Sequence, residues 1–508
     1  SAWIAWVSWR STKPARAMTT SAGPILAALK AAATTEDGQQ ARLLGDDGSY
    51  TLAEVVAQSE RLAATLSALG VQPGDRVAHL GKNSAALLIL LFACARMGCV
   101  LMPLNWRLSG KEWAWMLDDA APRVLLTLHG YQTQAAELGV PTYDLGALIA
   151  RGSADDRVPD TGRGGDDLLL VYTSGSTGRP KGAVHGQDAV WANAQFSAAM
   201  HDYNLGGRQD RVLTILPMFH VGGLAIQTLS ALLSGAQVRV MTAFEPNQMA
   251  ALHESFKPTL TLHVPATLQA MLALPAWSGL DLSDLRAVAI GSTDVPLGLI
   301  SALQDRGIPA LQVYGATESG PISIFQTVDQ ALAQPGSIGT APRGVEIKLR
   351  NASGAQPGLN EPGEILIKAP NLASRYWPDK PLIDNDGFWA SGDVASVDVQ
   401  GVYWFRDRLK NVVISGGENI YPAEIERVLR GIAGIADCCV VGVPSARWGQ
   451  TPVAVIEGEA RPLEPIQKQL SDELARYKHP RRIIFVDALP RNAMGKVVRD
   501  DVRALVLE

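Results

Sequence analysis

The sequence predicts an α/β protein: a large N-terminal domain of helix-covered sheets with a β-rich subdomain, then a small, mobile α+β C-terminal domain. Three observations support this prediction. Apolar strands alternate with helices from about residue 50, glycine and proline become frequent after about residue 335, and the segment from about 409 has its own strand–helix pattern. Such alternation is typical of parallel sheets covered by helices. A chain of 508 residues is too long for one ordinary core.

The first half of the chain provides the elements of the larger domain. Apolar spacing predicts a helix over 51–70 and a short strand over 74–81. The apolar run 85–95 is followed by Arg96 and is shorter than the about 20 residues of a membrane span, so it predicts a buried helix over 85–97. Further strands are predicted over 98–104, 123–128, 168–173, 211–217, 236–241, 259–265, 285–291 and 308–315, with helices over 190–200 and 297–306.

The last third of the chain differs in composition and in strand pattern. Short alternating strands at 364–369 and 402–407, between turns rich in glycine, proline and aspartate, predict the β-rich subdomain. Beyond it, strands are predicted at 411–417, 437–444, 452–458 and 482–487, with a helix at 423–431. The final segment is long enough, at roughly 100 residues, for a small independent domain.

Charge and cysteine content exclude several functions. The formal net charge is −5 without a long basic block, which argues against nucleic acid or an anionic membrane surface as the main partner. Four cysteines without metal-ligand or disulfide spacing indicate thiols in a reducing compartment, so a cytoplasmic protein is expected. Residues 1–17, which hold three tryptophans before Met18, are expected to be a disordered or non-native extension.

The stretch after the predicted strand 168–173 suits a loop that wraps an anion. Its glycines let backbone N–H groups turn inward, its hydroxyls can donate to phosphate oxygens, and its lysine adds a positive charge. The Walker pattern is not matched, because Gly182 follows the lysine where Ser or Thr should stand. A flexible surface linker is the alternative. The candidate phosphate-binding residues are Thr173, Ser174, Gly175, Ser176, Thr177, Gly178 and Lys181.

This stretch, YTSGSTGRPKG, resembles the phosphate-loop signature of the acyl-adenylate-forming superfamily, which includes acyl-CoA synthetases, luciferases and peptide-synthetase adenylation domains. Four further motifs follow in the family's order, at 314–319, 391–393, 408–420 and 490–496. The resemblance spans essentially residues 25–506. It implies an AMP-forming ligase in which a carboxylic acid and Mg-ATP give an acyl-adenylate and pyrophosphate. The thiol of coenzyme A then displaces AMP.

The resemblance also implies a role for each nucleotide motif. Thr317 would bind the α-phosphate, and Glu318 would coordinate Mg²⁺, a hard cation that prefers oxygen ligands. Asp393 would accept hydrogen bonds from the ribose hydroxyls, and Arg408 would add a second ribose contact. The adenine would lie against Tyr314, with Gly291, Ser292, Thr293 and Gly315 around it. Read without the resemblance, Glu318 and Asp393 are ordinary turn residues and Arg408 is a surface cation.

The C-terminal motifs are implied to act in both half-reactions. Lys496 would bridge the carboxylate and the α-phosphate during adenylation and then swing away with its domain. The implied boundaries are an AMP-binding domain over 18–405, a hinge over 406–410 and a C-terminal domain over 411–508. After rotation, Gly416 and Gly417 would line a narrow passage for the pantetheine arm. Trp448 and residues 477–479 either contact coenzyme A or belong to the ordinary surface of the domain, and both alternatives stay open.

The acid is expected to lie beside His220. This histidine is expected to orient the carboxylate and not to act as a base, because a carboxylate is already deprotonated at pH 7. Asp294 disfavours a second carboxylate on the substrate if it points inward. An aromatic acid (hydroxycinnamate- or benzoate-like) or a short-to-medium-chain acid is expected. The candidate pocket residues are Phe219, Val221, Gly222, Gly223, Leu224, Gln227, Gly315 and Pro321.

Three alternatives stay open: an enzyme that loads an acyl carrier protein, a luciferase-like oxygenase and a non-enzymatic binding module. The expected partners are a small carboxylic acid and coenzyme A, with no nucleic acid and no stable membrane insertion. A homodimer is an open option.

Overall fold

Two eight-stranded sheets form the larger part of the molecule. The computed structural model describes residues 23–152, 158–173, 180–291, 295–416, 418–492 and 495–507. In the first sheet the strand order is β14–β13–β12–β11–β9–β10–β1–β2, and β13 through β1 run parallel. Its strands are β1 (Arg42–Gly45), β2 (Gly48–Thr51), β9 (Arg211–Thr214), β10 (Gln237–Val240), β11 (Leu260–His263), β12 (Ala287–Gly291), β13 (Ala310–Tyr314) and β14 (Ile324–Phe325).

The second sheet carries the predicted phosphate loop. Its order is β18–β17–β8–β7–β4–β3–β5–β6, with β7 through β6 parallel and β8 antiparallel to β7. The predicted phosphate loop therefore joins two adjacent antiparallel strands. The strands are β3 (Arg76–Leu80), β4 (Val100–Leu104), β5 (Val124–Thr127), β6 (Thr142–Asp144), β7 (Asp167–Thr173), β8 (Lys181–Gly186), β17 (Arg375–Tyr376) and β18 (Lys380–Pro381).

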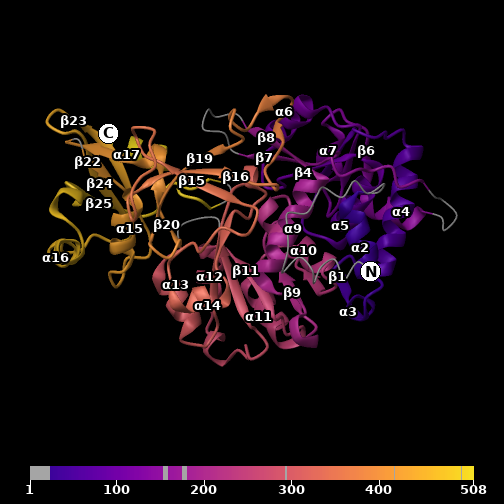
Figure 1. Ribbon diagram of the computed structural model, residues 1–508, viewed down its shortest axis with the longest axis horizontal. Coiled ribbons are helices and arrows are strands. Elements are labelled where there is room, and N and C mark those ends of the chain that lie inside the picture. The colour runs from indigo at the N-terminus through magenta and orange to yellow at the C-terminus, as the bar shows by residue number, and fades with distance from the viewer. Residues whose placement is uncertain are drawn as a thin grey trace.

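Helices cover both sheets, and local sequence signals explain several of their ends (Figure 1). In α4 the Thr51 side chain accepts from Glu54 N while the Glu54 carboxylate accepts from Thr51 N, a reciprocal cap. In α5 Ser84 caps the start and Gly98, with φ of 70°, ends the helix. The helices are α2 (Pro24–Ala32), α3 (Glu36–Gln40), α4 (Leu52–Ala68), α5 (Ala85–Met97), α6 (Gly110–Ala120), α7 (Gln132–Ala136), α8 (Leu145–Arg151), α9 (Gln187–His201), α10 (Leu229–Leu233), α11 (Pro246–Ser255), α12 (Pro265–Leu272), α13 (Leu297–Gln304) and α14 (Val328–Ala333).

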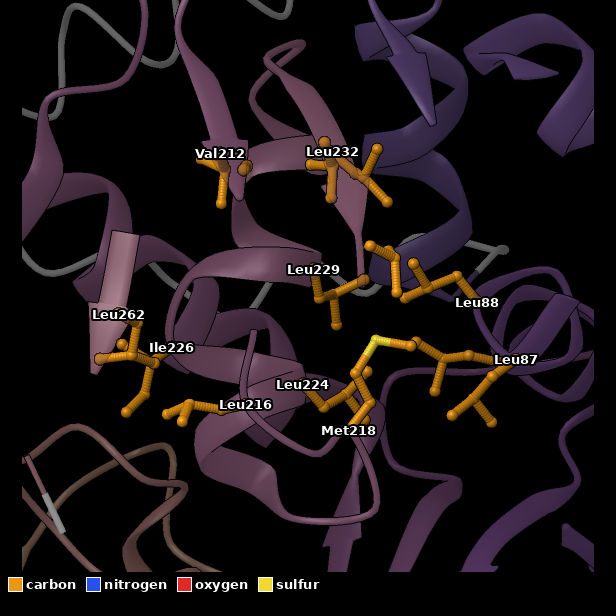
Figure 2. Packing of buried hydrophobic residues seen from close by; sticks show 14 of the residues in the cluster. Leu87, Leu88, Val212, Leu216, Met218, Leu224, Ile226, Leu229, Leu232 and Leu262 are labelled. Atoms are coloured by element: carbon orange, nitrogen blue, oxygen red, sulfur yellow. The ribbon is translucent and has the colours of Figure 1, made fainter. Parts of the chain in front are cut away.

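The main core lies where α5 meets the segment after β9. Every residue of α5 is buried, so the apolar run 85–97 is a core helix, as predicted. Figure 2 shows Leu87 and Leu88 of α5 facing Met218 and Leu229. Shortening a fully buried leucine to alanine costs about 2–5 kcal/mol, so this packing fixes the segment that follows β9. Among the described residues, no helix combines the length and apolar character needed to cross a bilayer.

A third sheet and a separate C-terminal sheet complete the chain. The third is antiparallel in the order β15 (Glu346–Arg350), β16 (Gly363–Lys368), β19 (Trp389–Val397) and β20 (Tyr403–Arg408), which is the predicted β-rich subdomain. The C-terminal domain lies at one end of the molecule in Figure 1. It contains β21 (Val413–Ser415), β22 (Glu418–Ile420), β23 (Cys438–Ser445), β24 (Gly449–Glu457), β25 (Arg482–Val486), α15 (Pro422–Arg430), α16 (Glu464–Glu473) and α17 (Arg499–Leu507).

Candidate active site

The parallel strands of the first sheet end at one edge, where several predicted site residues lie. Gly291 ends β12 beside Val313 of β13 in the strand register, and Tyr314 ends β13. The chain then turns sharply at Gly315, where a Cβ would lie 1.8 Å from the Pro321 carbonyl oxygen. Only glycine permits this approach of two backbone segments. The turn presents the 3₁₀ helix Thr317–Ser319 next to the sheet edge.

Tyr314, Asp393 and Arg408 form one cluster, although they come from different sheets. The Tyr314 hydroxyl donates to Asp393 Oδ2 at 3.0 Å, and Arg408 Nε lies 3.4 Å from Asp393 Oδ1. Burial raises the pKa of the Asp393 carboxyl, while Arg408 and the Tyr314 hydrogen bond oppose that shift. A carboxylate held between a phenol and a guanidinium, at the edge of a buried aromatic ring, fits a ribose and its adenine.

Glu318 is held by a tyrosine that the sequence did not reveal. The Tyr376 hydroxyl of β17 donates to Glu318 Oε1 at 2.9 Å, and the Lys181 ammonium lies 5.7 Å from the centre of the Tyr376 ring. Lys181 is also the register partner of Thr173, so β7 and β8 hold both ends of the predicted phosphate loop. The loop residues Ser174, Gly175, Ser176, Thr177 and Gly178 lie outside the described residues.

The donor set around Glu318 fits Mg²⁺ that is shared with a substrate. The described residues contain no group of three or more His, Cys, Asp and Glu side chains that could hold a metal alone. Mg²⁺ is commonly bound through one or two carboxylates together with substrate phosphates. The oriented Glu318 carboxylate, close to Lys181 at the end of the predicted phosphate loop, matches that pattern.

His220 and Lys496 come together from different domains. The pKa of His220 is lowered to about 4 by burial first, and then by the nearby positive charges of Lys496 and Arg107. The pKa of Lys496 is lowered by burial and by Arg408, while Asp393 acts in the opposite direction. Lys496 of the C-terminal domain therefore lies close enough to His220, Arg408 and Asp393 for their charges to influence one another.

A π-helix begins two residues after His220, in the segment where the acid is expected to lie. It spans Gly222–Thr228, which is a wide helical turn of a kind found frequently at functional sites. At Gly223 a Cβ would lie 2.2 Å from the Pro217 carbonyl oxygen, so this residue packs against the backbone. At Gly222 the nearest atom to a Cβ is Ile226 Cδ1 at 3.9 Å, an ordinary contact distance, so a Cβ meets no steric clash there. Gln227 points elsewhere: its amide nitrogen contacts His201 Nε2 at 3.0 Å.

Among the described residues, no contact links the candidate coenzyme A residues to the cluster of Tyr314, Asp393 and Arg408. Gly416 N donates to the Trp448 carbonyl oxygen at 2.8 Å, and Arg447 stacks on the Trp448 ring at 4.7 Å. Lys478 pairs with Glu424 of its own domain. The predicted residues Gly417, Ser292 and Thr293, and also Asp294, lie outside the described residues.

Sequence reasoning missed Arg107 and Tyr376. Arg107 follows the end of β4, so the rule that ligands meet strand ends would have marked it. Tyr376 carries no such local signal, because its partner Glu318 is distant in the sequence.

Comparisons with known proteins identify the family of the chain. The AMP-binding enzyme family matches residues 29–377, and the AMP-binding enzyme C-terminal domain matches residues 424–496. The chain is 40% identical over 482 residues to an indoleacetate–CoA ligase of Aromatoleum aromaticum, covering 91% of this chain and 93% of the relative. It is 39% identical over 470 residues to a feruloyl-CoA synthase of Amycolatopsis sp., covering 90% and 94%. Among solved structures, the o-succinylbenzoate CoA synthetase of Bacillus subtilis with its acyl-adenylate intermediate superposes with a TM-score of 0.82 at 29% identity, covering 94% and 97%.

Proposed function

The chain belongs to the AMP-binding enzyme family and is an acid–thiol ligase that uses ATP, Mg²⁺ and coenzyme A, and we propose that its acid is a flat aromatic carboxylic acid. The observation that carries this proposal is the absence of a side chain at Gly222, two residues after His220, where the nearest atom to a Cβ is 3.9 Å away. A planar ring needs width beside the carboxylate, and a missing side chain at this position provides it. The relatives named for indoleacetate and ferulate, both aromatic acids, support the same class.

The proposed first step joins the acid to the nucleotide. A carboxylate oxygen attacks the α-phosphorus, the bond to the bridging oxygen breaks, and pyrophosphate leaves with that electron pair. Two anions must meet, so the barrier is lowered by alignment and by fixed positive charge. We assign the charge to Lys496 and to Lys181, while Mg²⁺ at Glu318 would neutralise the phosphates. With a pKa of about 4, His220 is neutral at pH 7 and orients the acid through a hydrogen bond.

In the proposed second step the thiol of coenzyme A loses its proton to solvent and the sulfur attacks the acyl carbonyl carbon. The bond from that carbon to the phosphate oxygen breaks, and AMP leaves with the electron pair. We propose that the chain divides at 406–410 and that the C-terminal domain turns about this hinge between the steps. The short 3₁₀ helix Leu409–Asn411, which joins β20 to β21, supports a hinge there. A homodimer and a cytoplasmic location stay predictions, to be checked by analytical ultracentrifugation and by cell fractionation.

The substrate proposal is tested with a panel of acids and a pyrophosphate-release assay. Indoleacetate, ferulate, benzoate, butyrate, octanoate and palmitate are compared, with free coenzyme A as the acceptor and thioester as the second readout. We expect an aromatic acid to have the highest kcat/KM. A preference for an aliphatic acid would make the aromatic assignment wrong, and adenylate without thioester would favour a carrier protein as the acceptor.

Filling the space at Gly222 tests the pocket itself. Gly222→Leu is expected to lower kcat/KM for the aromatic acid about 100-fold, by excluding the ring, and to change that for butyrate less than about fivefold. The matched control is Gly298→Leu in α13, another helical glycine with open space around it. Equal losses for aromatic acid and butyrate in Gly222→Leu would contradict the placement of the ring.

A further inference from the structure

Asn193 is a buried amide that contacts both halves of the candidate site. It lies on α9 and is fully buried. Its Nδ2 donates to the Ala225 carbonyl oxygen of the π-helix at 2.8 Å, and its Oδ1 accepts from Ile322 N at 3.1 Å. One side chain thereby joins the π-helix to the loop that carries Glu318.

Side chains of α9 add hydrogen bonds to the π-helix. Within the π-helix, the Thr228 hydroxyl donates to the Gly223 carbonyl oxygen at 2.7 Å. Two successive carbonyl groups, those of Ala225 and Ile226, accept from Asn193 and Ser197 of α9. The position of the π-helix is therefore set by polar side chains of α9, and not only by apolar packing.

The nucleotide loop is held at the same point from its other side. Asn371 Nδ2 donates to the carbonyl oxygens of Ser319 and Ile322, each at 2.7 Å, and lies 3.4 Å from Asn193 Oδ1. The backbone around Glu318 is thus fixed by two buried amides that touch each other.

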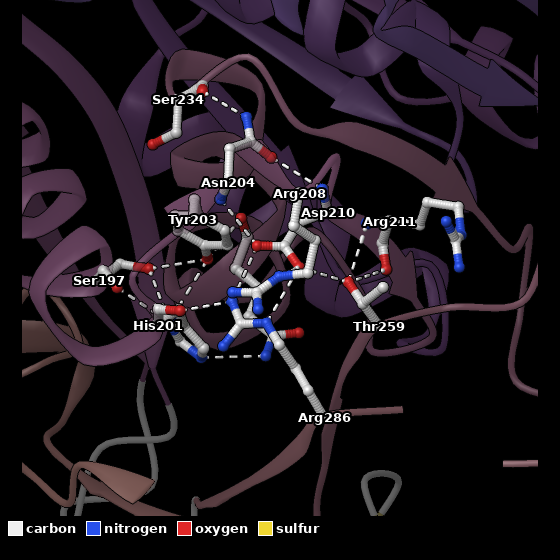
Figure 3. A network of polar contacts seen from close by, with 11 residues as sticks. Ser197, His201, Tyr203, Asn204, Arg208, Asp210, Arg211, Ser234, Thr259 and Arg286 are labelled. Carbon is white, nitrogen blue, oxygen red and sulfur yellow. Dashed lines mark hydrogen bonds and ion pairs between the residues drawn. The ribbon is translucent and has the colours of Figure 1, made fainter. Parts of the chain in front are cut away.

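Polar contacts hold α9 in place, so the backbone that carries Asn193 has a fixed position. Figure 3 shows the C-terminal end of α9, where His201 and Ser197 lie in a polar network with Arg286 and Asp210. Arg286 donates to the His201 carbonyl oxygen and pairs with the buried Asp210 carboxylate at 2.9 Å. A movement of either site element relative to α9 would break a buried hydrogen bond, which costs about 1–3 kcal/mol.

We propose that Asn193 is a positioning residue that couples acid binding to nucleotide binding. An acid that orders the π-helix also orders the loop of Glu318 through this amide, and a bound nucleotide does the reverse. Such coupling is reciprocal and is typically 5–150-fold in affinity. It aligns the carboxylate with the α-phosphate, where a misplacement of about 1 Å costs about 100-fold in rate. This inference rests on the proposed acid pocket at the π-helix.

The test measures how much the acid tightens nucleotide binding. Calorimetry gives the dissociation constant of α,β-methylene-ATP with Mg²⁺, with and without the acid that the wild type adenylates fastest. Asn193→Asp keeps the acceptor for Ile322 N but replaces the donor to Ala225 with an oxygen. We expect the acid to tighten binding at least fivefold in the wild type and less than twofold in Asn193→Asp. Binding of either ligand alone should change less than about threefold, and single-turnover adenylation should slow about 100-fold.

The matched control is Ser197→Ala, which loses a hydrogen bond to the π-helix but has no contact with the Ile322 backbone among those found. It should retain the coupling. The inference is overturned if the wild type shows no coupling, or if Asn193→Asp keeps it. If Asn193→Asp does not fold, Asn193→Ser is measured with the same two criteria. If the fastest acid is aliphatic, the aromatic substrate is wrong, yet the coupling is measured with that acid in the same way.

Discussion

Removal of the Lys496 ammonium is expected to separate the two half-reactions. In Lys496→Ala the acid and nucleotide still bind, but the charge that faces both anions during attack is lost. The pKa of Lys496 is lowered by burial, so its charge acts in a partly desolvated site. A unit charge about 4 Å away at an effective dielectric constant of about 20 is worth roughly 4 kcal/mol.

That interaction corresponds to a loss of about 100- to 1,000-fold in the adenylation rate, as for the removal of one preorganised electrostatic contact in other enzymes. The assay is pyrophosphate release in a single turnover. Thioester formation from supplied acyl-adenylate is measured in parallel and should change less than about threefold, because that step needs no phosphate attack. The control is Lys468→Ala in the same domain, which removes an exposed lysine that pairs with Asp472. A similar loss in both half-reactions for Lys496→Ala would refute the role given to this residue.

Three further outcomes are expected. Tyr376→Phe removes the hydrogen bond that orients Glu318, so the Mg²⁺ concentration for half-maximal activity should rise about tenfold; an unchanged Mg²⁺ titration would contradict this. Asp393→Asn removes a charged acceptor and should raise KM for ATP about tenfold with little change in kcat, measured with saturating acid. The melting temperature should fall as the pH drops from 6.5 to about 3: the unfolded chain takes up protons near pH 6.5, whereas burial lowers the pKa of folded-state histidines to about 4 or 3. A flat profile over that window would count against neutral buried histidines, which are His79, His185, His201, His253 and His263.

The sequence was sufficient where a signal is local. The buried helix over 85–97 is correct to the residue, since a uniformly apolar run lies between a capping serine and a glycine that ends the helix. The predicted strand over 211–217 is too long, because β9 ends at Thr214 and the chain then turns toward His220. The hairpin of β1 and β2 was missed, since strands of this length carry little periodic signal.

The residues of the candidate site were proposed one motif at a time, and their arrangement could not be predicted from the sequence. Tyr314 and Asp393 were identified from separate motifs, yet their hydrogen bond joins two sheets that are distant in the sequence. The π-helix was missed, since two of its carbonyl groups accept hydrogen bonds from Asn193 and Ser197, which lie on another helix. Hydrogen bonds of this kind are decided by tertiary packing, which no window of sequence contains.

The approach of Arg107 and Lys496 to the neutral His220, and of Arg408 to Lys496, has an energetic consequence for the catalytic cycle. These cations repel one another, and Asp393 offsets only part of that repulsion until a further anion binds. A triphosphate bound beside these cations would stabilise the closed arrangement, and departure of pyrophosphate would remove most of the screening charge. Departure of pyrophosphate, the first product, would therefore favour movement of the C-terminal domain away from the site.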